Sequence, residues 1–307
     1  MLGILLGLGS AVAFGANSII TRRGVLRVSS NYVATISIFT GFFFFILVTG
    51  VTGDLFGIAR LPWKAYLFWA LSGVIHFALG RTWAYRSLQL LGSNRSNIVT
   101  SLSPIATVAL AMLLLGETAT ALQFIGILFT LAGPLVMLCK EQTIGEGSPM
   151  QSGSHGKEVD ARTLLLGVLY GAGAALFWGS SAIFIKFGLD AGGTPVAGTL
   201  IAYTAASVVI GPSFLFSAEK RGELWREGRK PLPIAIFSGL TTSIAQLLRY
   251  ISYGYGSVIV VSLMLRTLPL WVLLFAFSFN REYESFSRWV LFGNGLLMIG
   301  TILIIIS

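Results

Sequence analysis

The chain is built from long apolar stretches that alternate with short polar ones. The apolar stretches are about 17 to 25 residues long, enough for a helix to cross roughly 30 Å of hydrocarbon. They lack the two-residue alternation of transmembrane barrel strands. The pattern therefore predicts an all-α integral membrane protein. The predicted spans are residues 2–20, 33–52, 66–84, 97–115, 120–138, 164–184, 197–216, 234–253, 257–278 and 289–306.

One polar stretch, residues 140–162, is longer than the others and interrupts this pattern. It is rich in glycine and serine and carries charges of both signs, which is typical of a flexible, exposed linker. The linker divides the chain into a first five-helix repeat at residues 1–139 and a second at residues 163–307.

The two halves resemble each other in sequence. Residues 3–24 align with residues 167–188 at an offset of 164, with seven identities of which five are glycine. Further matches at an offset of 165 pair Tyr85 with Tyr250, Pro104 with Pro269, and Glu117 with Glu282. Because each half has an odd number of spans, the second must enter the membrane from the opposite side. We therefore predict ten transmembrane helices arranged as two inverted five-helix repeats, as in many secondary transporters.

The repeated glycines and prolines have predicted structural roles. Gly3 and Gly7 are four residues apart, a spacing that lets two helix backbones approach closely in a membrane. Pro104 and Pro269 fall inside predicted spans, where each removes a backbone hydrogen bond and favours a kink. We expect the glycines to serve packing and the two prolines to act as hinges.

Composition and charge agree with a membrane protein. The residues are 55% hydrophobic and only 11% charged, against about 25% charged in soluble domains. Fifteen lysines and arginines fall in the loops after odd-numbered spans and three in the loops after spans 2 and 6. Since such residues are enriched in cytoplasmic loops, this bias predicts cytoplasmic odd loops and external termini. It also accounts for the net charge of +9 without a nucleic-acid partner.

One motif carries a family resemblance. Ser103-Pro104, then Leu114-Leu115-Gly116-Glu117, then Gly126 and Gly133 are followed in the second half by Pro269, Glu282, Gly293 and Gly300. This pattern resembles the EamA type of the drug/metabolite transporter superfamily over the whole chain except the linker. The resemblance implies a ten-helix carrier of small organic solutes. It also implies cytoplasmic termini, against the loop charges, and the second half departs from it by having Arg281 before Glu282.

Three arginines fall within predicted spans, where charge is costly and marks function by default. On one helix face, Arg249 is accompanied by Gln246, Tyr250 and Tyr253. Arg81 lies on a similar stripe of a helix that is the repeat mate of the first, so we expect the two arginines to face a shared cavity from pseudo-symmetric positions. Guanidinium groups with aromatic walls suit a carboxylate or a phosphate. The predicted substrate-binding residues are Arg266, Arg249, Arg81, Gln246, Tyr250, Tyr253, Tyr85, His76, Asn17 and Ser181.

Each of these residues also has a structural interpretation. Arg81 and Arg249 lie close enough to span ends to extend toward lipid headgroups. Arg266 would instead bond to carbonyls freed by Pro269, and His76, Asn17 and Ser181 would make interhelical hydrogen bonds. None of the twelve acidic residues falls deep in a predicted span. This favours exchange, facilitated diffusion or coupling through the substrate's own charge.

These features favour a secondary transporter that works by alternating access on an anionic or zwitterionic solute. A lipid or polyprenyl-phosphate flippase is the main alternative, and a membrane-embedded enzyme acting on lipid is disfavoured by the lack of a catalytic constellation. No cofactor or metal is expected, because the chain has no phosphate loop, dinucleotide fingerprint or zinc-ligand spacing. The expected partners are a small-molecule substrate and the lipid bilayer, with the chain acting as a monomer or homodimer in the bacterial cytoplasmic (inner) membrane.

Overall fold

The structure is a computed structural model that describes residues 1–25, 30–144, 161–216, 222, 232–279 and 288–306. Every regular element within these ranges is helical, which confirms the predicted all-α fold. Most of the linker, including residues 145–160, lies outside the described residues, as does Glu282.

The helices of the first half are α1 (Leu2–Val25), α2 (Ser30–Thr52), α3 (Asp54–Ile58), α4 (Trp63–Gly73), the π-helix η1 (Val74–Gly80), α5 (Arg81–Thr100), α6 (Ser103–Leu114) and α7 (Ala121–Ile144). Those of the second half are α8 (Ala161–Asp190), α9 (Pro195–Phe216), α11 (Leu232–Tyr255), α12 (Val258–Met264), the 3-10 turn η2 (Leu265–Thr267), α13 (Leu268–Phe279) and α14 (Arg288–Ile306). Each predicted span overlaps one or more of them, and the short α3 was not predicted. Within the described ranges, seven helical stretches are long and apolar enough to cross a membrane, so the number ten remains a prediction.

The chain reverses direction within α5. A Cβ atom built on Gly171 of α8 would lie 2.8 Å from the Ser87 Oγ and 2.9 Å from a methyl carbon of Val99. In a straight helix these two residues would be roughly 18 Å apart. The chain therefore turns back between them, as expected if the predicted spans 66–84 and 97–115 are separate crossings.

The repeated glycines of α1 and α8 make equivalent contacts. A Cβ on Gly15 would lie 2.8 Å from the Cβ of Trp271, and one on Gly179 would lie 2.8 Å from the Cβ of Ala106. For each matched pair of glycines, the two residues that they contact are 165 positions apart. Gly3 packs against Gly256, and Gly167 packs against Leu91. The same holds for Gly7 with Met264 and Gly171 with Val99, and for Gly9 with Leu248 and Gly173 with Trp83. The packing role predicted for these glycines is confirmed, and the contacts show a common register in the two halves.

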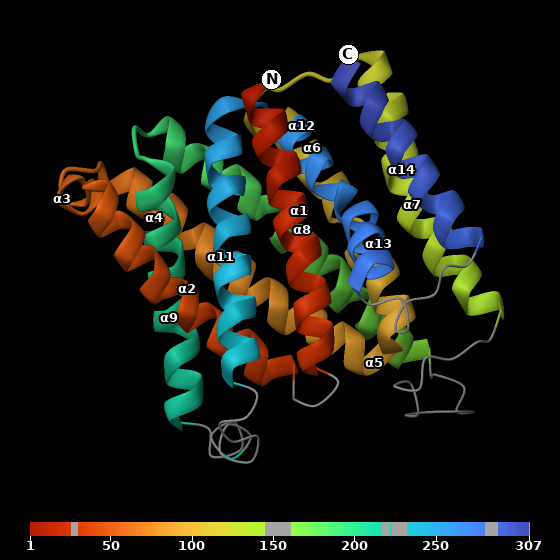
Figure 1. Cartoon of the computed structure of the whole chain (residues 1–307), viewed down its shortest axis with the longest axis horizontal. Helices are drawn as coiled ribbons and strands as arrows, with labels where there is room; N and C mark the ends of the chain where they lie inside the picture. The colour runs from red at the N-terminus through yellow and green to blue at the C-terminus, as the bar shows by residue number, and fades with distance from the viewer. Residues whose placement is uncertain (26–29, 145–160, 217–221, 223–231, 280–287, 307) are drawn as a thin grey trace.

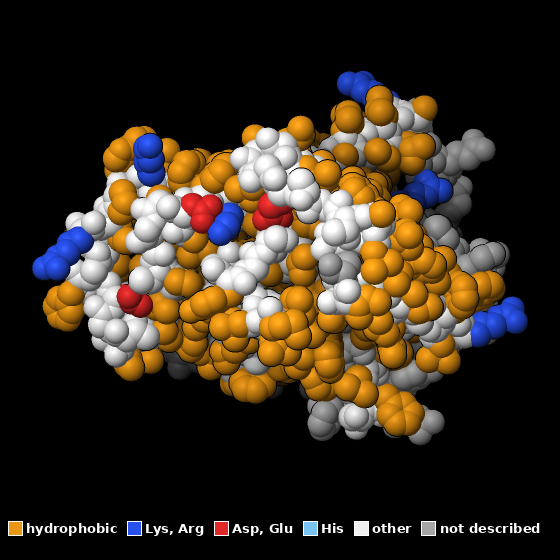
Figure 2. Space-filling view, turned by 90° about the horizontal axis from the view of Figure 1, so that it is seen from above, with side chains coloured by type: hydrophobic (Ala, Val, Ile, Leu, Met, Phe, Trp, Pro, Cys, Tyr) orange, Lys and Arg blue, Asp and Glu red, His pale blue; other side chains and the backbone are white. Residues whose placement is uncertain are grey.

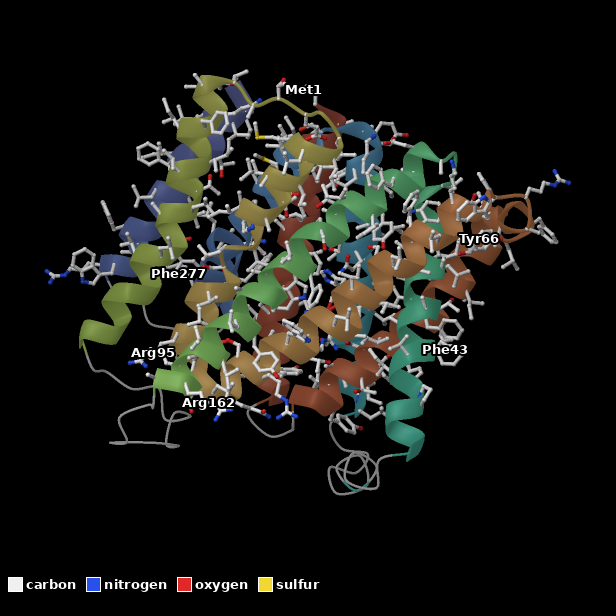
Figure 3. All side chains as sticks on the ribbon, turned by 180° about the vertical axis from the view of Figure 1, so that it is seen from behind. Met1, Phe43, Tyr66, Arg95, Arg162 and Phe277 are labelled. Atoms are coloured by element: carbon white, nitrogen blue, oxygen red, sulfur yellow. The ribbon has the colours of Figure 1, made fainter. Side chains whose placement is uncertain are left out.

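The two halves run in opposite directions. Both termini lie at one end of the molecule (Figure 1). Arg162, near the start of α8, lies with Arg95 at the end opposite Met1 (Figure 3). Helices α1 and α8 therefore begin at opposite ends, as an inverted repeat requires. Figure 2 looks onto the end that carries the termini, where both basic and acidic side chains are visible. The orientation of the termini in the membrane remains a prediction from the loop charges.

Both predicted kinks correspond to interrupted helices. Pro104 lies in the first turn of α6, after a break at Ser101 and Leu102. Pro269 lies in the first turn of α13, after the 3-10 turn η2. A proline is tolerated in a first turn because its missing N–H would have no intrahelical partner there. The interruptions are observed, while movement about them remains a prediction.

Helices α7 and α14 pack backbone against backbone at one side of the molecule (Figure 1). A Cβ on Gly300 would lie 2.6 Å from the Gly126 carbonyl oxygen, and one on Gly133 would lie 2.5 Å from that of Gly293. Glycine is required at these positions because the opposing atoms belong to the main chain and cannot move aside.

We predict that Gly300→Ala lowers the stability of the protein, whereas Gly295→Ala does not. An added methyl group at position 300 would overlap α7, at a cost of about 1 to 3 kcal/mol, but it meets nothing within 4 Å at position 295 of the same helix. Tryptophan fluorescence during heating of the two detergent-purified variants would measure the difference. Equal melting temperatures would contradict the close α7–α14 contact.

Candidate functional site

Helix α11 presents four polar or aromatic side chains to the interior. Gln246 is 3% exposed, Arg249 6%, Tyr250 3% and Tyr253 1%. The common face that their spacing predicts is therefore a buried face, and the guanidinium of Arg249 lies inside the protein rather than extending to the lipid headgroups.

Arg249 is held by neighbours on two helices. Its Nη2 donates to the Ser181 Oγ of α8 at 3.0 Å, and its Nη1 donates to the Gln246 Oε1 at 3.3 Å. The guanidinium carbon lies 5.6 Å from the ring centroid of Tyr253, within the range of a cation–π interaction. The remaining donor, Nε, has no hydrogen-bond partner among the described residues.

His76 completes a closed circuit of hydrogen bonds. Its Nδ1 lies 3.1 Å from the Ser181 Oγ, and its Nε2 lies 3.5 Å from the Gln246 Nε2. We call His76, Ser181, Gln246 and Arg249 the polar ring. The ring joins η1 of the first half to α8 and α11 of the second, so it spans the interface between the two repeats.

Local structure places these side chains. His76 lies in the π-helical segment η1, and π-helical turns occur frequently at functional sites. Ser72, one turn earlier, donates to the Ser181 carbonyl oxygen at 3.2 Å and lies 3.3 Å from the Tyr250 hydroxyl. It thereby fixes α4 against both α8 and α11. Ser72 was not predicted as a site residue, because a serine in an apolar run carries no distinctive sequence signal.

Arg266 lies in the break between α12 and α13. Its Nη2 donates to the Ser103 Oγ at 2.7 Å, and its Nε has no partner in the described part of the chain. It is close enough to Arg249 and Tyr253 to interact electrostatically with both. The sequence indicated Ser103 only as part of the motif with Pro104, and its bond to Arg266 adds it to the candidate site.

Within the described part of the chain, acidic side chains do not neutralise the buried arginines. Three acidic side chains are described: Asp190 pairs with Lys186 at 2.9 Å, Glu117 bonds to backbone, and Asp54 accepts from Thr52. Among the described residues, neither Arg249 nor Arg266 has a carboxylate partner. Because burying an unpaired charge costs several kcal/mol, this arrangement suits an anionic ligand.

Arg81 and Tyr85 lie on the first turns of α5, beside the ring. Arg81 is near enough to Tyr85, Tyr203 and His76 to interact electrostatically. The expectation that Arg81 and Arg249 are pseudo-symmetric needs correction. The register of the glycine contacts pairs position 81 with 246, so the counterpart of Arg81 is Gln246 and that of Arg249 is an alanine.

Asn17 takes part in a second interhelical contact. Its Oδ1 accepts from Ser238 at 2.8 Å and from Thr241 at 3.1 Å, which joins α1 to α11. In sequence, Asn17 corresponds to Ser181 and Thr241 corresponds to His76. The Asn17–Thr241 contact is therefore the repeat copy of the Ser181–His76 contact, and the bonds from Ser238 and Thr241 do not involve the polar ring.

The outer surface carries an apolar groove between η1, α6 and α8. It has a volume of about 290 Å³ and is lined by residues such as Ile75, Leu110, Leu176 and Phe184, with Ser180 the one polar side chain. Ser180 faces the groove, while Ser181 faces the polar ring. This lining suits hydrocarbon and offers no group to bind an anion.

Glu117 lies in the turn after α6, as predicted, and caps a helix in the other half. Its Oε1 accepts from the Val258 N–H at 2.6 Å and its Oε2 from the Ile259 N–H at 2.9 Å. Two unsatisfied N–H groups at the start of α12 are thereby bonded, and the negative charge meets the positive end of the helix.

The comparisons with known proteins agree with this fold. The profile of the EamA-like transporter family matches residues 1–139 and 165–306. The chain belongs to the EamA-like transporter family. A curated relative from Sinorhizobium sp., described as an uncharacterized transporter in the cobO 3′ region, is 26% identical over 130 residues, which cover 41% of this chain and 90% of the relative. A solved structure described as "Crystal structure of protein" has a TM-score of 0.77 at 17% identity and covers 98% of this chain and 94% of its own. This likeness shows the fold alone.

These findings confirm the EamA resemblance. The protein is an integral membrane transporter of the drug/metabolite transporter superfamily. The transporter assignment agrees with the prediction that the chain is not an enzyme.

We predict that Glu117→Ala destabilises the protein by about 1 to 2 kcal/mol, the cost of losing a helix cap. Glu117→Gln retains one acceptor oxygen and should lose less. Thermal unfolding in detergent would rank the wild type above the Gln variant and the Gln variant above the Ala variant. An Ala variant that melts at the wild-type temperature would exclude a capping role.

Proposed function

We propose that this transporter carries an anionic or zwitterionic organic solute, and that the polar ring together with Arg266 binds the carboxylate or phosphate of that solute. The observation that carries the proposal is the burial of Arg249 without a carboxylate partner in the described structure. The planar guanidinium can bind a carboxylate or a phosphate through two parallel hydrogen bonds.

Each group has a distinct role in this proposal. Arg249 and Arg266 supply charge from two different spans, and the buried Nε of each has no hydrogen-bond partner among the described residues. Tyr253 lies beside both guanidinium groups and forms an aromatic wall. Because two nearby cations repel each other, an anion between them replaces repulsion with two attractions. Arg81, Tyr85, Tyr250, Gln246, His76 and Ser181 complete the proposed site, whereas the contacts of Asn17 favour a role in helix packing.

The position of the ring supports a mechanism of alternating access. His76 belongs to the repeat that we place at residues 1–139, and Ser181 and Arg249 belong to that at 163–307. A movement between the halves would expose the ring to one side of the membrane at a time. The broken helices at Pro104 and Pro269 border Ser103 and Arg266, where such a movement would release the ligand. We place the protein in the bacterial cytoplasmic membrane, as a monomer or homodimer.

A flippase for a lipid phosphate is the second candidate, and the apolar groove favours it. The groove lies on a face of α8 next to the one that carries Ser181 and is open to the outer surface. A phosphate bound by the arginines could thus be joined to a chain that occupies the groove. The two functions differ in their ligands, since only the flippase requires an apolar tail.

The test is a thermal-shift screen of the detergent-purified protein against amino acids, dicarboxylic acids, nucleotides, sugar phosphates and farnesyl phosphate. A ligand at about 100 times its dissociation constant stabilises the protein by about 2.7 kcal/mol. We expect anionic or zwitterionic members to raise the melting temperature of the wild type. Arg249→Gln should abolish the shift, and Arg249→Lys should weaken it, because an ammonium group cannot replace the guanidinium fork.

Lys186→Gln is the matched control, because it also removes one positive charge but from an ion pair away from the ring. It should retain the shift. Arg266→Ala tests the second arginine in the same way. Stabilisation by farnesyl phosphate but by none of the water-soluble anions would favour the flippase. Stabilisation by neutral or cationic solutes alone, equal in all variants, would refute the proposed site.

A further inference from the structure

We propose that this protein transports a proton together with its anion, and that Nε2 of His76 is the proton-binding atom. This inference rests on the proposed function. It follows from the hydrogen-bond roles within the polar ring, which are consistent with only one protonation state of His76.

Arg249 sets the direction of the bonds around the ring. A guanidinium can only donate hydrogen bonds, so the Gln246 atom 3.3 Å from its Nη1 must be the amide oxygen. The amide nitrogen of Gln246 then faces His76 at 3.5 Å and also donates. The Nε2 of His76 is therefore an acceptor and carries no proton.

The hydrogen bonds of Ser181 indicate the same tautomer of His76, because they assign the proton on Nδ1. Its hydroxyl hydrogen is directed to the Trp178 carbonyl oxygen at 2.8 Å. Its oxygen then accepts from Arg249 at 3.0 Å and from the Nδ1 of His76 at 3.1 Å. The Nδ1 must carry the imidazole proton. Both arguments give a neutral His76 protonated on Nδ1.

Adding a proton to Nε2 breaks the ring at one place. The new N–H would face the N–H of Gln246, so the Gln246 amide must turn and present its oxygen to His76. This turn leaves the Nη1 of Arg249 facing an amide nitrogen, and the Arg249–Gln246 bond is lost. Protonation of His76 thus frees a second donor of Arg249 for a ligand, in addition to its unpartnered Nε.

The charges around His76 link the proton to the anion. Arg249 of α11 and Arg81 of α5 lie within electrostatic range of the imidazole, and Tyr250 and Tyr253 belong to the same face of α11. From α8, Trp178 donates to the His76 backbone oxygen at 3.2 Å. No carboxylate among the described residues faces this group. An imidazolium would therefore be repelled until an anion arrives, so the proton and the anion favour each other's binding by the same factor.

The consequence is proton–anion symport. The proton enters from solution, resides on Nε2 while the anion occupies the site, and leaves when the anion is released and the two arginines again repel the imidazolium. The absence of acidic residues from the spans argued against carboxylate-based coupling. A histidine can perform that role because its charge changes near neutral pH.

The tautomer of His76 can be measured without knowing the substrate. The chain contains two histidines, so nitrogen-15 histidine labelling of His155→Gln protein gives signals from His76 alone. Near neutral pH in detergent, we expect a neutral imidazole protonated on Nδ1. Protonation on Nε2, or an imidazolium without anion, would overturn the ring and the proposal with it.

The second experiment measures proton movement in proteoliposomes that contain a trapped pH dye, with the membrane potential clamped by potassium and valinomycin. An inward gradient of each soluble anion in the screen is applied, and anion uptake is followed with radiolabel. We expect the transported anion to acidify the lumen by about one proton per anion. His76→Asn retains a donor near the Nδ1 position but cannot bind the proton. It is expected to lower anion uptake, because His76 belongs to the binding site, and the uptake that remains should bring in no proton per anion.

Thr241→Val, at the repeat counterpart of His76, is the control and should leave acidification unchanged. Anion uptake without acidification in the wild type would refute the coupling but not the transport function. Unchanged acidification in His76→Asn would refute His76 as the proton site. Uptake of none of the anions would refute the proposed substrate class and, with it, symport.

Discussion

Close approach of helix backbones is the constraint on which the rest of this structure depends. In lipid, apolar side chains gain little by leaving the solvent for a neighbouring helix, so helices associate mainly through tight packing and interhelical hydrogen bonds. Here a Cβ on Gly179 would lie 2.8 Å from the Ser103 carbonyl oxygen, and one on Gly73 would lie 2.1 Å from that of Ala202. These contacts bring α8 close to α6 and α4 close to α9. Two elements that carry the polar ring are in similar close contact, since a Cβ on Gly80 of η1 would lie 2.6 Å from the Trp178 ring of α8.

The packing is shared by the two halves, but the chemistry is not. The glycine contacts repeat at a constant offset, yet the counterparts of Arg249, Arg266 and His76 are an alanine, a serine and a threonine. Of the three arginines in the proposed site, the buried Arg249 and the partly buried Arg266 thus belong to the second half, and Arg81 belongs to the first. An inverted repeat supplies two related conformations, and this unequal distribution of charge suits one binding site shared by both conformations.

The role proposed for Arg249 rests on the burial of its side chain and on the geometry of its hydrogen bonds. A partly buried arginine near a membrane surface could be satisfied by headgroups, but this one is 6% exposed and bonds to neutral side chains. Neutral acceptors orient a guanidinium without cancelling its charge. In the proposed site, the remaining positive charge and the Nε, which has no partner among the described residues, would bind the ligand. The same ring is the basis for the proposal that His76 has a single neutral form.

Periodicity and repetition in the sequence determined the class of fold. Apolar stretches of helical length, glycines at a spacing of four and matching prolines were sufficient for an all-α membrane protein with an inverted repeat, because hydrocarbon permits few other structures. The motif around Pro104 and Glu117 was also sufficient for the family. The buried face of α11 was predicted from its spacing, since residues three and four apart on a helix lie together.

Only the tertiary structure decided which side chains meet. Asn17 and Ser181 occupy matching positions, yet the first bonds to Ser238 and the second to Arg249. Glu117 caps a helix that begins 141 residues later in the chain. Ser72 and Ser103 gave no signal of a site role, because hydroxyl groups in apolar runs usually bond within their own helix. The spacing of residues along one helix indicates the direction in which each side chain points. The residue that it contacts depends on how closely two helices approach, and glycines elsewhere in the chain control that distance.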